Sequence, residues 1–135
     1  MTMIALIMAV ALGGAHADAV TGQWRTQTRN GVVEIDRCGE TICGRLTHSI
    51  GLDANPALAD LNNSDPRLRG RPLKGLQILG GFTLREGAWS GGSIYNAQDG
   101  RTYQATVTPI DPDHLKVRGC IFAPLCKTET WVRIH

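Results

Sequence analysis

The chain has 135 residues, of which 42% are hydrophobic and 19% charged, and its formal net charge is +2. This length suits one domain, the composition excludes a disordered chain, and the small net charge excludes a broad basic face for nucleic acid. The one basic cluster, at residues 67–74, contains no aromatic side chain on which bases would stack. The 16 glycines and the low aromatic content of 5% favour many short strands over long helices.

The amino-terminal part is an apolar run from Met3 to Leu12, followed by Ala15-His16-Ala17. A short apolar stretch that ends in an A-x-A pattern predicts a secretory signal peptide over residues 1–17, cleaved after Ala17. Ten apolar residues are too few to span a bilayer. We therefore expect a periplasmic protein whose mature chain, residues 18–135, forms a single domain without a transmembrane segment.

Four cysteines follow this segment, at positions 38, 43, 120 and 126. An even number of cysteines in an exported chain predicts two disulfides, for which three connectivities exist. Zinc is the alternative, but four and five residues between the paired cysteines are looser than the usual zinc-binding spacing. We expect disulfides, and neither a metal nor a cofactor.

The first predicted hairpin surrounds Asn30-Gly31, the dipeptide that most strongly indicates a two-residue turn between strands. With that turn, residues 24–29 pair with 32–37, and Trp24 lies opposite Arg37. Alternation along the two strands then separates a core face from a solvated face. The expected core face carries Trp24, Thr26, Thr28, Val33 and Ile35.

The second predicted hairpin returns from residue 43 to residue 48. If Cys38 faces Cys43, Ile35 faces Leu46 on the core side, so the disulfide and the apolar pattern require the same register. The other two cysteines would close the last hairpin of the chain in the same way. The expected disulfides are Cys38–Cys43 and Cys120–Cys126.

Residues 49–75 contain three prolines and many Asp, Asn and Gly residues, which predict one long irregular loop. Residues 57–61 could form a short helical turn within it, with Asn55 as its cap. Strands are expected again at 76–79, 88–96, 101–108, 114–120 and 127–134. About eight antiparallel neighbours remove their exposed edges by closing, so the predicted fold is an all-β, small antiparallel barrel.

Two resemblances accompany this pattern. Gly22-Gln23-Trp24, with Arg133 on the last strand, resembles the lipocalin signature, in which an Arg packs over the Trp and closes the barrel floor. Most of the mature chain resembles a bacterial family of exported proteins, domain of unknown function 2147. The matching segments are 22–24, 33–35, 38–39, 43–44, 60–73, 91–95, 99–103, 115–119 and 130–133. The resemblance implies a lipocalin-like barrel and an envelope location, and it implies no established reaction.

The long loop supplies the first candidate site. Arg67, Arg69 and Arg71 alternate, so a strand would direct all three to one side, where they could bind an anionic group. The alternative is that they pair with Asp60 and Asp65 and lock the loop. The acidic and amide residues do not match a calcium loop, and turn formation explains them. The candidate ligand-binding residues here are Asn63, Asp65, Arg69 and Arg71.

The expected core side of the barrel supplies the second candidate site. Trp24, Arg37, Trp131 and Arg133 share this side, and Glu129 has the same parity, so an interior Arg–Glu contact is one expectation. These residues either plug the barrel or form the polar end of a ligand cavity.

The sequence contains no nucleophile, zinc-protease or phosphate-loop motif, so we expect a binding protein and not an enzyme. The predicted function is a monomeric, periplasmic, lipocalin-like binding module for a small apolar or amphipathic ligand. The alternative is an interaction module with a solid core, which docks an envelope protein through the 49–75 loop.

Overall fold

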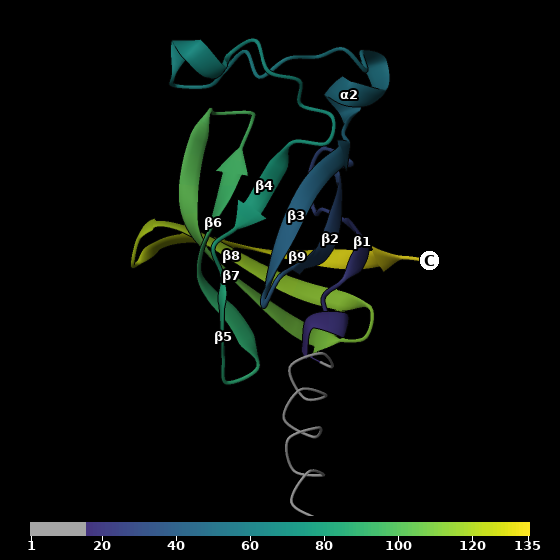
Figure 1. Cartoon of the computed structure of the whole chain (residues 1–135), viewed down its shortest axis with the longest axis vertical. Coiled ribbons are helices and arrows are strands. Elements are labelled where there is room, and N and C mark those ends of the chain that lie inside the picture. Colours follow the sequence, from purple (N-terminus) through teal and green to yellow (C-terminus); the bar gives the residue numbers. More distant parts are fainter. Residues whose placement is uncertain (1–15) are drawn as a thin grey trace, which may run out of the picture.

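The computed structural model describes residues 16–135, so most of the predicted signal peptide lies outside the described residues. The nine strands of the described part are β1 (Gly22–Arg25), β2 (Val32–Cys38), β3 (Thr41–His48), β4 (Gln77–Gly80), β5 (Thr83–Arg85), β6 (Ala88–Asn96), β7 (Arg101–Asp111), β8 (His114–Phe122) and β9 (Leu125–Ile134). They form one antiparallel sheet in the order β4-β3-β2-β1-β9-β8-β7-β6-β5. Because β4 also pairs with β6, eight strands close into a barrel and β5 lies outside the ring (Figure 1). The all-β barrel is confirmed.

The first hairpin has the predicted faces but a different register. Trp24 pairs with Val33 and not with Arg37, a shift of four residues. The turn is centred on Arg29 and Asn30, whose φ angles are 61° and 49°, one residue earlier than expected. The chain leaves the ladder after Arg25, where Thr26 bonds locally to residues 28 and 31. Since the shift is even, Trp24, Val33 and Ile35 keep the predicted core face. Thr28, which was also expected there, lies beyond the end of β1 and is exposed.

The second hairpin is also displaced, by two residues. Cys38 pairs with Thr41, because Gly39 and Glu40 form a two-residue turn in which Gly39 takes a φ of 65°. The Cys38–Cys43 disulfide is nevertheless present and joins the strands diagonally, with 5.7 Å between the Cα atoms. Cys120 and Cys126 are direct partners on β8 and β9 and form the second disulfide. Both predicted disulfides are confirmed.

Between β3 and β4 the chain forms the predicted long loop, with two short helices, α2 (Ile50–Ala54) and η1 (Pro66–Leu68). The expected helical turn at 57–61 is wrong, because α2 comes earlier in the chain. Ser49 caps its start by accepting a hydrogen bond from the Leu52 amide. Pro56 forces Asn55 into an extended conformation and ends it. None of the helices among the described residues is long and apolar enough to cross a membrane.

The interior of the barrel holds one apolar cluster to which eight of the nine strands, all but β5, contribute buried side chains. Trp24 and Trp131 are its largest fully buried members and lie on β1 and β9, the strands that join the two ends of the chain. The cluster consists of Ala17, Val20, Trp24, Val33, Ile35, Ile42, Leu79, Phe82, Trp89, Ala105, Val107, Leu115, Val117 and Trp131. This packing fixes the wall on which the candidate site is built.

Candidate functional site

The most elaborate part of the surface is the segment of residues 58–73, here called the cap, which lies across the upper end of the barrel (Figure 1). Its two ends are held together by main-chain bonds. The Leu73 amide donates to Leu58 O at 3.1 Å, and the Asp60 amide donates to Arg71 O at 2.9 Å. A loop whose ends meet in this way is a compact, self-packed unit and not a flexible tether.

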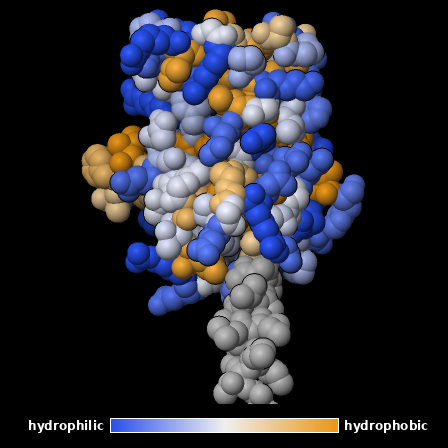
Figure 2. Space-filling model, in the orientation of Figure 1, coloured by the Kyte–Doolittle hydropathy of each residue, from blue (hydrophilic) through white to orange (hydrophobic). Residues whose placement is uncertain are grey.

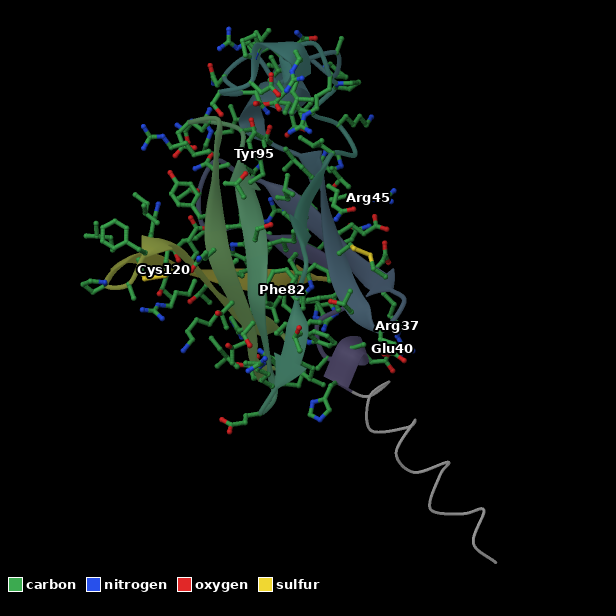
Figure 3. The ribbon with its side chains drawn as sticks, turned by 60° about the vertical axis from the view of Figure 1, so that its left-hand side comes forward. Arg37, Glu40, Arg45, Phe82, Tyr95 and Cys120 are labelled. Atoms are coloured by element: carbon green, nitrogen blue, oxygen red, sulfur yellow. A yellow bond between two sulfur atoms is a disulfide. The ribbon has the colours of Figure 1, made fainter. Side chains whose placement is uncertain are left out.

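The centre of the cap is the carboxylate of Asp60, which is fully buried. The Tyr95 hydroxyl donates to its Oδ1 at 2.6 Å, while Asn63 Nδ2 and Arg71 Nε donate to its Oδ2 at 2.8 and 2.9 Å. Tyr95 lies on β6, just below the cap (Figure 3). The buried charge is therefore paired and hydrogen-bonded on both oxygens, as a buried carboxylate requires.

The environment sets the charge state of this cluster. Burial acts to raise the pKa of Asp60, but hydrogen bonds from Tyr95, Asn63 and Arg71 outweigh it and hold the pKa below its ordinary value. Burial and the hydrogen bond to Asp60 raise the pKa of Tyr95 to about 12. The guanidinium of Arg71 also lies over the Tyr95 ring, 5.2 Å from its centroid. At neutral pH the carboxylate is charged and the phenol is protonated.

A second attachment joins the cap to the turn between β6 and β7. Asn62 Nδ2 donates to the main-chain oxygens of Ala97 and Gln98, at 3.3 and 3.1 Å. The backbone of Gly100 approaches the cap so closely that a Cβ there would lie 1.7 Å from Asn62 O. Only glycine permits this approach, and its φ of 73° also favours glycine.

Between the cap and the barrel wall lies an open cleft of about 630 Å³. Leu79 points inward and pairs with Ile94, so Ser93 and Tyr95 on either side of Ile94 point outward, and the cleft lies on the outer face of the sheet. Its lining mixes apolar and polar groups: Asn63, Ser64, Leu68 and Arg71 from the cap, Gln77 to Gly81, Ser93, Tyr95, Gly100 and Thr102. A site with this lining suits a small amphipathic molecule.

The four loop residues predicted as ligand-binding have mainly structural partners. Arg71 pairs with Asp60, and Arg69 Nε donates to Asn63 O at 2.8 Å. Asp65 pairs with its neighbour Arg67 at 3.1 Å. The alternative, that the arginines lock the loop, accounts for these contacts. Asn63 and Arg71 also line the cleft, whereas Asp65 and Arg69 do not border it.

Of the four residues predicted on the core side, the structure brings three together and places Arg37 apart from them. Trp24 and Trp131 are buried, and Arg133 lies over Trp24 with its Cζ 4.3 Å from the ring centroid. Arg37 is exposed and pairs with Asp18, so it lies outside the interior. Glu129 accepts a hydrogen bond from Trp131 Nε1 at 3.0 Å, and this contact takes the place of the expected Arg–Glu contact.

The two predicted groups lie at opposite ends of the barrel. The cap contacts the β6–β7 turn, whereas Arg133 Nε bonds Pro112 O in the β7–β8 turn, at the other end of β7. A second open cleft of about 490 Å³, lined in part by Arg133 and His135, lies at that end. Within residues 16–135, no group of three or more His, Cys, Asp or Glu side chains is arranged to hold a metal ion.

Sequence reasoning missed the outward residues of the wall. Tyr95, Ser93 and Thr102 were assigned to strands, but no site role was given to them. The sequence marks these residues only by their polar character at alternate strand positions. Such a pattern is typical of any solvated strand face and does not indicate a binding site. Asp60 was expected to pair with an arginine, as it does, but not to be buried.

The closed barrel with its cap defines a lipocalin-like module. A solved structure with this fold is that of protein HP1028 from the human pathogen Helicobacter pylori, described as belonging to the lipocalin family. The two chains are 25% identical, with a TM-score of 0.76 over 86% of this chain and 83% of the other. Residues 22–133 match the family of uncharacterized proteins conserved in bacteria, domain of unknown function 2147, and the chain belongs to it. Among curated proteins, none matches the chain.

Proposed function

We propose that this protein is an exported, periplasmic, lipocalin-like binding module that holds a small amphipathic molecule in the cleft beneath the cap. The observation that carries the proposal is the cleft itself. Its volume of about 630 Å³ lies within the range of small-molecule sites, and its walls belong to two rigid parts, the sheet and the hydrogen-bonded cap.

The lining indicates what such a ligand would present. Leu68 and Ile78 offer apolar surface, and Ser93, Thr102 and Asn63 offer hydrogen-bonding groups. Arg71 uses its Nε for Asp60 and is still one-third exposed, at 33%, so its terminal amino groups can bind a polar head. Because the barrel interior is occupied by the apolar cluster, the ligand is placed on the outer wall and not between Trp24 and Trp131.

Export is part of the proposal and has separate support. Two disulfides persist in an oxidising compartment, and the apolar run before Ala15-His16-Ala17 has the pattern of a signal peptide. We propose a monomer with a binding role and no catalytic one. The intact mass of exported protein should correspond to a chain that begins at Asp18, and a mass that includes residues 1–17 would contradict the signal peptide.

The cleft is tested by filling it. Native mass spectrometry of periplasmic protein should show a co-purifying small molecule, and the purified protein should bind anilinonaphthalene sulfonate, an amphipathic probe. Ser93→Trp places an indole in the cleft and should abolish both signals. Thr106→Trp is the matched control, because Thr106 points outward on β7 away from the lining. Equal binding by both variants would refute a ligand site under the cap.

A second candidate function is protein docking through the 49–75 loop, of which the cap is a part. It is favoured by two apolar side chains that the structure leaves open to solvent, Ile50 at 59% and Leu61 at 64% exposure. Leu61→Glu would then remove a partner protein from affinity-purified material while Ser93→Trp would retain it. Loss of a co-purifying small molecule in Ser93→Trp, with that molecule retained in Leu61→Glu, supports the small-molecule site instead.

A further inference from the structure

The β8–β9 hairpin extends beyond the barrel. The pairing of β7 with β8 ends at Gln104 and Cys120, and the pairing of β1 with β9 ends at Arg25 and Val132. Residues 121–125 therefore have only each other as strand partners, with Phe122 paired to Leu125. Figure 1 shows this yellow-green hairpin projecting sideways from the barrel.

The tip of this hairpin, residues 121–125, is apolar and uncovered. Its sequence is Ile-Phe-Ala-Pro-Leu, and the exposed fractions of Ile121, Phe122 and Leu125 are 55%, 58% and 55%. None of these side chains joins the barrel's apolar cluster. Figure 2 shows the tip as a hydrophobic projection from the side of the molecule. Exposed apolar surface that protrudes in this way marks an interaction site.

The hairpin is stiffened where it leaves the sheet. An isolated two-stranded hairpin is only marginally stable in water. Here Cys120 and Cys126 are direct cross-strand partners and are covalently joined, which closes the loop that carries the tip (Figure 3). The cross-link restricts the unfolded alternatives of this loop and so favours the extended hairpin. The apolar side chains are thus held away from the barrel that could otherwise cover them.

Cations flank the tip on both strands. Lys116 and Arg118 are exposed on β8, and Lys127 is exposed on β9. The one acidic residue between positions 116 and 130 is Glu129, which accepts the indole N–H of Trp131 and lies 3.7 Å from Lys127 Nζ, so it offsets one of these three cations. The base of the hairpin is therefore positively charged and its tip is uncharged.

We propose that this hairpin is a membrane-surface anchor, whose apolar tip enters the interface of a bilayer that contains anionic phospholipids while the cations at its base contact the headgroups. Ile121 and Phe122 on β8 and Leu125 on β9 are all more than half exposed, so both strands of the hairpin present open apolar side chains at the tip. A protein partner would cover one side, whereas lipid surrounds an inserted tip. Five residues cannot span a bilayer, so the protein would lie on the surface.

The test uses protein purified after export and vesicles of phosphatidylglycerol mixed with phosphatidylcholine, or of phosphatidylcholine alone. Wild type should sediment with the mixed vesicles and much less with phosphatidylcholine. Phe122→Ser should weaken binding to the mixed vesicles roughly tenfold or more, because a buried aromatic side chain contributes about that factor. Arg118→Ala should weaken it about fivefold, from about 1 kcal/mol per cation at an anionic surface.

Leu61→Ser is the matched control, because Leu61 is equally open but lies in the cap, and it should bind vesicles like wild type. Wild-type binding by Phe122→Ser would overturn the proposal. So would a tip-dependent dimer in analytical ultracentrifugation, since the tip would then serve a second copy of the chain. Ser93→Trp should keep vesicle binding, so the anchor and the cleft can fail independently.

Discussion

Arg133 and Trp24 are direct cross-strand partners on β9 and β1, and the guanidinium lies over the indole ring. The same guanidinium donates to Thr21 O at 2.7 Å and to Ala19 O at 3.1 Å, which ties the amino-terminal chain to the last strand. Gly22 makes this possible, because a Cβ there would lie 2.6 Å from Arg133 Nη1. The stacking of Arg133 on Trp24 beside Gly22 thus explains why the sequence has these three residue types at these positions.

We expect Arg133→Ala to reduce the free energy of unfolding by about 1–3 kcal/mol, since it removes the stacking and the bonds to main-chain oxygens. Arg133→Lys should retain only part of the stability that Arg133→Ala loses, because an ammonium group cannot stack on the indole ring as a guanidinium does. Urea denaturation measures both, with Arg118→Ala, an exposed arginine on β8, as the control. An Arg133→Ala protein as stable as that control would contradict a structural role for the contact.

The buried Asp60 predicts acid sensitivity. Its pKa is lowered in the folded protein relative to about 3.9 in the unfolded chain, so its stabilising contribution is present above pH 4 and is lost as the pH falls through the folded value. Asp60→Asn should cost about 2–4 kcal/mol at pH 7, because Arg71 loses its partner. The measurement is the free energy of unfolding between pH 7 and about pH 2.

The pH profile of Asp60→Asn provides the contrast. Asp65 and Asp111 also have lowered pKa values and are present in both proteins, so the difference between the two profiles reports Asp60 alone. That difference should shrink as the pH falls below about 4. A constant difference at all pH values would show that the charge of Asp60 does not hold the cap.

We expect Gly100→Ala to lift the cap from the barrel, because the new methyl group would overlap Asn62 O and the residue has a positive φ. The cost should be at least about 2 kcal/mol, with loss of probe binding in the cleft. Gly91→Ala is the control, since Gly91 has a φ of 70° but open space at its Cβ, so strain alone should cost about 1 kcal/mol. Similar melting temperatures for the two variants would contradict close packing of the cap.

The strands show why part of the fold follows from local sequence. Residues 88–96 form β6 with the predicted bounds, because turn residues stand at both ends, Glu86-Gly87 before the strand and Asp99-Gly100 after it. The two amino-terminal hairpins keep their predicted faces despite register shifts of four and two residues. Turn geometry set those shifts, and it depends on local hydrogen bonds such as those of Thr26, which alternation does not describe.

The sequence by itself therefore determined the barrel, the inward and outward faces of its strands and the two short-range disulfides, because each depends on residues close together in the chain. Only the tertiary structure decided the site. Asp60 and Tyr95 are 35 positions apart and meet because the cap folds onto β6 and Gly100 lets it approach. That meeting buries the carboxylate and leaves the cleft between cap and wall, and no periodicity in the sequence encodes how two such surfaces fit.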